Sequence, residues 1–314
     1  MFKNSINYPQ KNTSGISTLK PKVGLVLSGG SARGMAHLGV ISVLEEYGIP
    51  IDTIVAASFG SIVGAYYALG YDILTLIQMM KQFRLRSVLD LKRPFLRIMS
   101  REKIEAILRK DFGDKNLEEL RIPLYILAGD ITENRPILFE KGKIIDAVQA
   151  SISCPGLFEP YEINGHSFLD GGILNRLLVA FAKEKGIDVT IFSDVGLFNL
   201  LNRNKFARKI YMALMRHVEK KRGDLEKKLK RKNIRYIIFK AFCLIQDSEE
   251  QFRKKKYFSP DFTIVPSLMD VKPLAFSKVE EAFRLGREAT LRLIEKIAER
   301  VHSRVCDLRA DTIL

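Results

Sequence analysis

The sequence predicts an α/β protein with a mostly parallel central sheet that is covered by helices on both faces. Short apolar runs alternate with stretches whose apolar residues recur at helical spacing, and glycine-rich turns separate the two kinds of segment. The 314 residues contain neither an internal repeat nor a clear linker. Because a chain of this length can bury a large core, we expect one main domain.

Each element is predicted from a local pattern. Residues 1–20 are polar and are predicted to be a disordered leader, followed by a domain at 21–300 and a C-terminal tail at 301–314. Short apolar runs bounded by turn residues predict strands at 22–27, 51–57, 123–128, 136–140, 166–169 and 189–194. Helical spacing predicts helices at 35–47 and 62–69, within 71–120, and at 146–153, 203–235 and 280–301. Two further apolar runs, 236–242 and 262–265, lie near the end of the domain.

Positive charge is concentrated in one segment of the domain. The net charge of the chain is +15, and residues 203–256 hold 19 Lys and Arg against 6 Asp and Glu, an excess of 13. Such a segment attracts nucleic acid or an anionic membrane, unless it is only a solvated surface helix. It carries apolar positions such as Ile210 and Leu214, and no nucleic-acid-binding motif is present. We therefore expect an anionic membrane surface as a partner and no nucleic acid.

Other features of the composition restrict the class of protein. The N-terminus lacks the apolar run of a secretory signal, and no apolar segment reaches the roughly 20 residues that span a bilayer. Cys154, Cys243 and Cys306 are odd in number and widely spaced, which is typical of a reducing compartment, and no Cys/His cluster has metal-ligand spacing. We expect a cytoplasmic protein that attaches peripherally to membranes and needs no metal or cofactor.

A serine stands in a turn between a predicted strand and a predicted helix, in Ala56-Ala57-Ser58-Phe59-Gly60. A serine hydroxyl is a poor nucleophile unless a base removes its proton and the backbone exposes it. A tight turn at a helix N-terminus exposes it and favours developing negative charge. Gly60 suits the turn, whereas Ala56 stands where such an elbow usually has glycine, so its methyl group must be accommodated. Ser58 is therefore a candidate nucleophile.

A glycine-rich loop, Ser28 to Gly34, follows the first predicted strand. Consecutive glycines can aim backbone N–H groups at an oxyanion, each donor contributing about 3 kcal/mol, although the same geometry can bind phosphate. The loop lacks the Lys-Ser/Thr of a P-loop, and the chain has no G-x-G-x-x-G, so an oxyanion hole is the better interpretation. Arg33 would neutralise a phosphate head group or anchor the loop by hydrogen bonds, and we favour the anchor.

A carboxylate stands on a glycine-rich turn at Asp170-Gly171-Gly172. Such a tripeptide is often only a turn, but the chain offers no better base for Ser58. Its four histidines are His37, His166, His217 and His302. None of them stands at a position that indicates the base of a Ser-His-Asp triad, which favours direct proton transfer to Asp170.

The three motifs, in their order and spacing, resemble those of the patatin-like phospholipases, especially the bacterial group related to the catalytic domain of neuropathy target esterase. The resemblance covers roughly residues 22–297 and includes 150–158 and 261–266. It implies a three-layer α/β/α patatin-like fold and a Ser58–Asp170 dyad. It also implies an oxyanion loop and an elbow, formed respectively by Gly29, Gly30, Arg33 and Gly34 and by Ala56 and Gly60.

The chain departs from this family at two places. Ala56 replaces the first elbow glycine, and Asn175-Arg176-Leu177-Leu178 replaces the usual Asn-Asn-x-Pro, which we expect to change local packing only. Because the serine, the aspartate and the loop glycines are intact, the resemblance implies an active serine acyl hydrolase, a phospholipase or lysophospholipase that cleaves lipid esters without a metal. The alternatives are a non-enzymatic membrane-binding or nucleic-acid-binding protein on the same scaffold, and a short-chain esterase or thioesterase with the same dyad.

Overall fold

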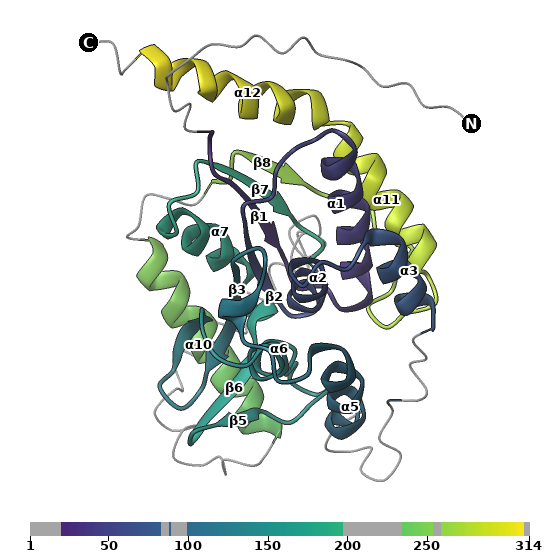
Figure 1. The fold of residues 1–314 in the computed structure, drawn as a ribbon. Coiled ribbons are helices and arrows are strands. Elements are labelled where there is room, and N and C mark those ends of the chain that lie inside the picture. The colour runs from purple at the N-terminus through teal and green to yellow at the C-terminus, as the bar shows by residue number, and fades with distance from the viewer. Residues whose placement is uncertain (1–19, 83–87, 89–98, 197–233, 254–258, 311–314) are drawn as a thin grey trace.

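A single mixed sheet forms the centre of the computed structural model, which describes residues 20–82, 88, 99–196, 234–253 and 259–310 (Figure 1). The strands are β1 (Val23–Leu27), β2 (Thr53–Ala57), β3 (Leu124–Asp130), β4 (Arg135–Phe139), β5 (Tyr161–Ile163), β6 (His166–Asp170), β7 (Val189–Ser193) and β8 (Phe262–Ile264). Their order is β5-β6-β3-β2-β1-β7-β8, with β4 paired to β3. Neighbours from β3 to β8 run parallel, whereas β4, β5 and β6 join by antiparallel pairings, which confirms the predicted, mostly parallel sheet.

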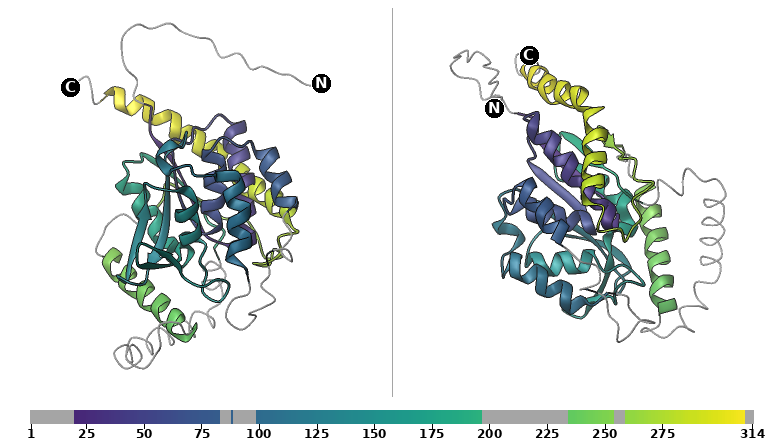
Figure 2. Two further views of the ribbon diagram at one scale, coloured as in Figure 1. Left: turned by 60° about the horizontal axis from the view of Figure 1, so that its bottom comes forward. Right: turned by 90° about the vertical axis from the view of Figure 1, so that its right-hand side faces the viewer.

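Helices cover both faces of the sheet (Figures 1 and 2). They are α1 (Ala36–Glu46), α2 (Phe59–Ala68), α3 (Ile73–Gln82), α5 (Arg101–Phe112), α6 (Ile144–Ser151), α7 (Asn175–Glu184), α10 (Ile234–Arg253), α11 (Val279–Leu291) and α12 (Ile294–Ala310). Short 3-10 turns are η1 (Ser31–Met35), η2 (Leu117–Glu119) and η3 (Gly171–Leu174). These helices and the sheet make three layers, as the sequence predicts.

Alternation along the buried strands divides the core between the two faces. Leu25 and Ile54 pack with residues of α1, α2 and α11 in the larger cluster, whereas Val26 and Val55 pack with residues of α7 and α10 in a smaller one. Successive side chains of a strand point to opposite faces, so a strand buried on both faces reads as a continuous apolar run. This is why β1 and β2 could be predicted from VGLVL and TIVAA.

Three segments differ from the sequence prediction or extend it. The apolar run 236–242 lies inside helix α10, whereas 262–264 of the second run forms β8. The single helix predicted at 280–301 is two helices, because the chain breaks after α11 and α12 leaves in another direction (Figure 1). Helix α12 continues without interruption across residue 300, where the predicted domain ends and the predicted tail begins. The predicted domain limits stay predictions.

Two sequence predictions concern parts of the chain that are not described. The predicted leader lies outside the described residues except for Lys20, and so does the basic segment 203–256 except for α10. Among the described helices, none combines the length and the apolar content that crossing a bilayer requires. The described residues also contain no group of three or more His, Cys, Asp or Glu side chains that could hold a metal ion.

Candidate active site

Ser58 lies in a strained elbow between β2 and α2. Its φ angle is +52°, in a region that side-chain-bearing residues rarely adopt, and its side chain is 8% exposed. The Ser58 N–H donates to Ser151 Oγ at 2.8 Å, and that hydroxyl donates to the Leu127 carbonyl at 2.7 Å. A Cβ at Gly60 would lie 2.6 Å from the Leu27 carbonyl oxygen, so only glycine lets α2 start this close to β1. The elbow thus presents Ser58 at a helix N-terminus.

The methyl group of Ala56, which the usual elbow glycine would lack, is accommodated in the core. Ala56 is fully buried in the larger cluster and faces α2 rather than the turn. A Cβ placed on Gly64 of α2 would be 3.6 Å from the Ala56 methyl carbon, an ordinary van der Waals distance. The methyl group of Ala56 therefore packs against α2 beside Gly64, within the core.

Strand register brings Asp170 to Ser58. Strand β3 pairs along one edge with β4, and along its other edge first with β2 and then with β6. Ala57, the last residue of β2, pairs with Leu127, and Asp170, the last residue of β6, pairs with Ala128. The two strands therefore meet end to end from opposite directions. The residue after β2 and the last residue of β6 are placed side by side.

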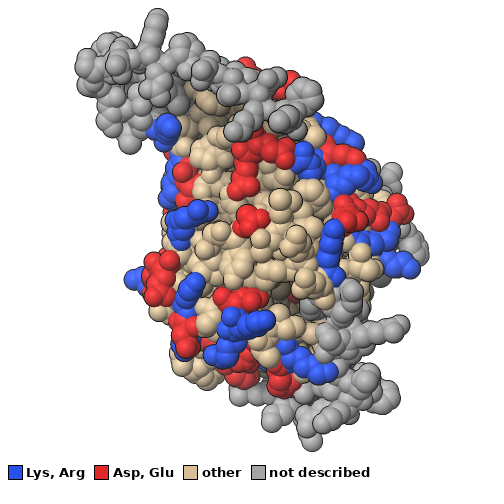
Figure 3. Space-filling model, turned by 45° about the vertical axis from the view of Figure 1, so that its right-hand side comes forward, with Lys and Arg blue, Asp and Glu red and all other residues tan. Residues whose placement is uncertain are grey.

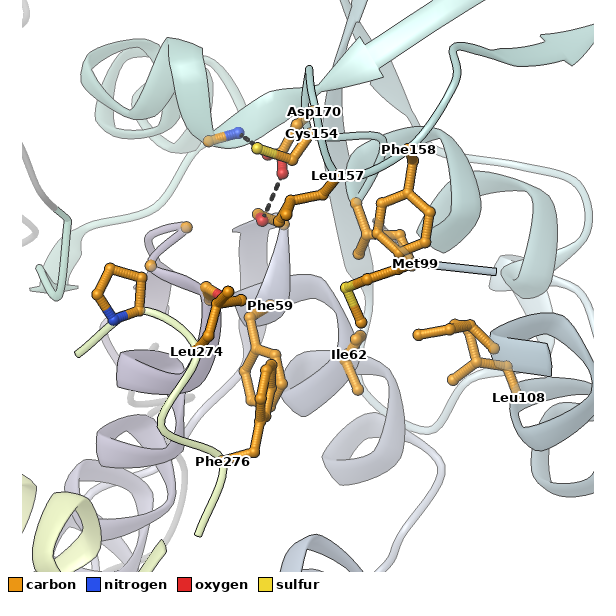
Figure 4. A pocket seen from close by; sticks show the side chains of 18 of the residues that line it. Phe59, Ile62, Met99, Leu108, Cys154, Leu157, Phe158, Asp170, Leu274 and Phe276 are labelled. Atoms are coloured by element: carbon orange, nitrogen blue, oxygen red, sulfur yellow. Dashed lines mark hydrogen bonds between the residues drawn. The ribbon is translucent and has the colours of Figure 1, made fainter. Parts of the chain in front are cut away.

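The hydroxyl of Ser58 donates a hydrogen bond to Oδ2 of Asp170 at 2.8 Å (Figure 4). The other carboxylate oxygen accepts the Gly172 N–H at 2.6 Å, and Asp170 is 5% exposed. Burial raises the pKa of Asp170 to about 7, although the bonds from the Gly172 N–H and the Ser58 hydroxyl act in the opposite direction. A Cβ at Gly171 would lie 1.9 Å from the Leu127 carbonyl oxygen, so the turn after Asp170 requires glycine.

The described histidines lie elsewhere. His37 is fully buried, and its Nε2 donates to the Ser28 carbonyl at 2.9 Å, so Nδ1 accepts the Ser193 hydroxyl at 2.7 Å. Burial lowers the pKa of His37 to about 4, so this ring stays neutral and supports the end of β1. His166 pairs with Asp130 at 2.8 Å, and neither ring lines the cavity beside Ser58. His302 is exposed on α12, and His217 lies outside the described residues.

The four loop residues predicted for the oxyanion hole fall into two groups. Gly29 and Gly30 line the cavity, and the Gly29 N–H donates to Asn175 Oδ1 at 2.8 Å. Arg33 is 5% exposed and its Nε donates to the Val271 carbonyl at 2.8 Å, as expected of an anchor. A Cβ at Gly34 would lie 2.5 Å from the ring of Phe59, so Gly34 permits close packing of η1 on α2.

An apolar cavity of about 500 Å³ opens beside the dyad (Figure 4). Asp170, Ser58 and the glycine loop lie at one end, and apolar side chains from α2, α3, residue 99, α5 and the loops at 152–158 and 273–276 line the rest. These side chains include Phe59, Ile62, Met80, Met99, Ile104, Leu108, Leu157, Phe158, Leu274 and Phe276. Such a lining suits an aliphatic chain, and the Ser58 hydroxyl, the candidate nucleophile, borders the same cavity.

Sequence reasoning missed several residues that shape this site. Ser151 accepts the hydrogen bond of the Ser58 N–H, and Asn175 accepts that of the Gly29 N–H, whereas we expected only a packing change at 175–178. The one available signal was an asparagine five residues after Asp170. The apolar lining residues carried no functional signal, because apolar positions in helices are ordinarily core.

Known proteins are similar to this chain over the region that holds this site. The family model "Patatin-like phospholipase" matches residues 25–183. The lysophospholipase nte1 of Aspergillus fumigatus is 38% identical over 180 residues, and the lysophospholipases NTE1 of Candida albicans and Saccharomyces cerevisiae are 38% and 37% identical over the same length. These alignments cover 55% of this chain but only 12%, 13% and 11% of the respective relatives.

Among solved structures, VipD from Legionella pneumophila is 17% identical with a TM-score of 0.44, over 88% of this chain and 67% of that chain. The family assignment does not depend on this likeness. It follows from the family model, which spans just over half of the sequence and includes the glycine loop, the elbow and the aspartate turn. The chain therefore belongs to the patatin-like phospholipase family.

Proposed function

We propose that this protein is a serine acyl hydrolase that cleaves an ester of a phospholipid or lysophospholipid. The observation that carries the proposal is the 2.8 Å hydrogen bond from Ser58 Oγ to Asp170 at the polar end of an apolar cavity. The names of the relatives support it, since the proteins that match over 180 residues are called lysophospholipases. The chain spans about an eighth of their length, so the inference concerns the chemistry of the shared region.

The acylation step uses groups that are already in contact. Asp170 takes the proton from Ser58 Oγ as that oxygen attacks the ester carbonyl carbon, and the carbonyl oxygen becomes an oxyanion beside the glycine loop. When the tetrahedral intermediate collapses, the carbon–oxygen bond to the alcohol breaks and Asp170 returns its proton to the leaving oxygen. A base with a pKa raised to about 7 is well matched to both transfers near neutral pH.

The deacylation step repeats the same roles with water. Asp170 removes a proton from a water molecule, whose oxygen attacks the acyl-Ser58 carbonyl, and the fatty acid leaves as Ser58 Oγ recovers the proton. The same oxyanion donors serve both steps, so no further group is required. A neutral His37 that is hydrogen-bonded on both ring nitrogens supplies no proton to this cycle.

The size and lining of the cavity favour a substrate with one long acyl chain. A cavity of about 500 Å³ lies within the range of roughly 300–1,000 Å³ that is usual for ligand pockets, and its lining is almost entirely apolar. The described lining residues carry one charged side chain, Asp170. A polar or charged head group would therefore stay outside the apolar part while the chain fills it.

A panel of substrates tests this proposal. We expect the purified chain to release fatty acid from a long-chain lysophospholipid with a kcat/KM at least about ten times that for p-nitrophenyl butyrate, because the apolar lining binds the chain through the transition state. A preference for the butyrate ester or for an acyl thioester would instead support the short-chain alternatives. No turnover of any member, together with no labelling by a fluorophosphonate, would support a non-enzymatic scaffold.

We also propose that the basic segment 203–256 docks the protein on an anionic membrane. Its excess of 13 positive charges lies mainly outside α10, since residues 203–233 hold 13 Lys and Arg against 3 Asp and Glu. On the face shown in Figure 3, the described acidic and basic side chains are interspersed around a mostly uncharged centre. The basic segment would supply attraction of about 1 kcal/mol for each basic residue near the surface.

Co-sedimentation with liposomes checks this docking. Binding should increase with the fraction of anionic lipid and decrease with salt, because screening shortens the range of the attraction. It should weaken when five clustered residues become glutamine, namely Lys227, Lys228, Lys230, Arg231 and Lys232. A matched control replaces Lys103, Lys110, Lys115, Arg121 and Lys141, which lie outside the segment, and should retain binding. Equal binding to neutral and anionic vesicles would contradict the proposal, as would tight salt-sensitive DNA binding without vesicle binding.

A further inference from the structure

Asn175 connects the glycine loop to the segment that carries Asp170. It is the first residue of α7 and follows Asp170 after the single turn η3. Its Oδ1 accepts the Gly29 N–H at 2.8 Å, and its Nδ2 donates to the Gly29 carbonyl at 3.2 Å. A backbone N–H can only donate and a carbonyl can only accept, so this contact needs a side chain that offers both an acceptor and a donor. The asparagine amide offers both.

Gly29 packs tightly against Ser58 and against the turn that follows Asp170. A Cβ at this position would lie 2.8 Å from both the Ser58 Cβ and the Gly172 Cα, so the loop passes directly over the nucleophile and the turn after Asp170. At this distance a small shift of the loop changes where its amides stand relative to the reacting carbonyl. Stabilisation of the oxyanion is sensitive to such shifts, because hydrogen-bond donors must lie about 2.7–3.1 Å from the oxyanion.

The Asn175 contact also decides which amides are available to an oxyanion. The Gly29 N–H is already bonded to the side chain, whereas the N–H groups of Gly30 and Ser31 donate to no other described residue. Both residues line the cavity, and Ser31 has a φ angle of +53°, a strained conformation like that of Ser58. The neighbouring Ser28 N–H and Ala32 N–H are bonded to the Ser193 and Pro273 carbonyls.

We propose that Asn175 is a positioning residue that clamps Gly29 and thereby fixes the Gly30 and Ser31 amides relative to the Ser58–Asp170 pair. This inference rests on the proposed acyl hydrolase function. One short segment carries both the base and the clamp, so the two halves of the site keep their spacing when the sheet and loops fluctuate. Asn175 acts on the reaction through the loop and does not touch the reacting atoms.

Three substitutions test the clamp. Asn175→Ala removes both hydrogen bonds, Asn175→Leu removes them while keeping the side-chain size, and Asn175→Asp keeps an acceptor for the Gly29 N–H but loses the donor. We expect each variant to lower kcat by about 10- to 100-fold and to keep KM within about threefold of wild type. The loss in kcat should be smaller than the 10²- to 10³-fold that removing a hydrogen-bond donor to the oxyanion typically causes. Thr132→Ala is the control, since it removes a side-chain bond to the Ser167 N–H, 2.9 Å long, outside the cavity.

A transition-state analogue separates positioning from a purely structural role. The affinity for a long-chain trifluoromethyl ketone, whose adduct with Ser58 carries an oxyanion, should fall by the same factor as kcat/KM, whereas the affinity for the product fatty acid should not change. Full activity in Asn175→Leu or Asn175→Asp would overturn the clamp, as would a loss confined to KM. An active wild type with unimpaired Asn175 variants refutes only this inference, while a wild type that neither turns over nor labels at Ser58 refutes the proposed function as well.

Discussion

Replacing Ser58 with alanine is expected to abolish both ester hydrolysis and labelling by a fluorophosphonate. The substitution removes only the oxygen that donates to Asp170 at 2.8 Å, and losing a nucleophile typically costs several orders of magnitude in kcat. Stability should change little, because alanine and serine both tolerate the elbow's φ angle of +52° equally poorly and the Ser58 N–H keeps its bond to Ser151. The rate of fatty acid release measures hydrolysis, and the intact-protein mass measures labelling. Thermal melting measures stability.

A second serine provides the control for this experiment. Ser167 lies on β6, the strand that ends in Asp170, but its exposed hydroxyl donates to Glu162 and does not line the cavity. Ser167→Ala should keep wild-type turnover and should still be labelled by the fluorophosphonate. Peptide mapping should locate that label on Ser58. Activity above about 1% of wild type in a folded Ser58→Ala variant would rule out Ser58 as the nucleophile.

Sequence patterns indicated the candidate motifs because close backbone contacts around each motif require glycine at a fixed position in the sequence. The elbow needs a small residue two positions after Ser58, and Gly60 lies too close to the Leu27 carbonyl for any side chain. The turn after Asp170 likewise needs glycine at 171, beside the Leu127 carbonyl. Such requirements appear in the sequence as glycines at fixed offsets from a reactive residue, and the order of three motifs made the family resemblance specific.

Other parts of the site depend on contacts between distant segments, which no single stretch reveals. The register that sets β6 end to end with β2 along β3 decides that Asp170 meets Ser58. The Ala56 methyl packs against α2 beside Gly64, and the partner of Gly29 is Asn175, 146 residues away. The apolar run 236–242 has no periodicity that separates a strand from a buried helix, and it forms part of α10. Each of these features is decided by packing between segments that are far apart in the sequence.

Replacing Asp170 with asparagine is expected to lower kcat/KM by roughly 10²- to 10⁴-fold, the usual contribution of a general base. The amide can still accept the Gly172 N–H and can donate to Ser58, so the geometry is kept, but it cannot take the serine proton. Substitutions of the four histidines should each leave a substantial fraction of activity per folded molecule, namely His37→Ala, His166→Ala, His217→Ala and His302→Ala. His37→Ala is also expected to lower the melting temperature, because it leaves the Ser28 carbonyl and the Ser193 hydroxyl without their partner.

The pH dependence of the wild type gives an independent check on the same carboxyl group. Deprotonated Asp170 is the base, so kcat/KM should rise with pH through an apparent pKa of about 7, the value to which burial raises this group. A limb near pH 4 would show that the pKa of Asp170 is not raised in the working enzyme. A histidine variant that shifts the limb, or that loses as much activity as Asp170→Asn while folded, would require a triad in place of the dyad.

The contribution of Asp170 to stability should change with pH in the direction opposite to activity. Between the unfolded pKa, near 3.9, and the folded value of about 7, the folded state binds more protons at Asp170 than the unfolded state, so this group's contribution to the free energy of unfolding falls as pH rises. His37 has the opposite sign, since its folded pKa of about 4 lies below the unfolded value and its contribution falls as pH decreases from about 6.5.

Comparing wild type with Asp170→Asn cancels the His37 effect, because both proteins contain that residue. The melting temperature of the variant relative to wild type should therefore increase from pH 5 to pH 8, as the wild type alone must carry a buried carboxylate. An equal difference at both pH values would show that Asp170 titrates below pH 5 and is too weak a base for this mechanism. If the difference instead increases as expected, activity and stability depend on one ionisation in opposite ways, since the burial that makes Asp170 basic enough to activate Ser58 also makes its charged form costly to hold in the fold.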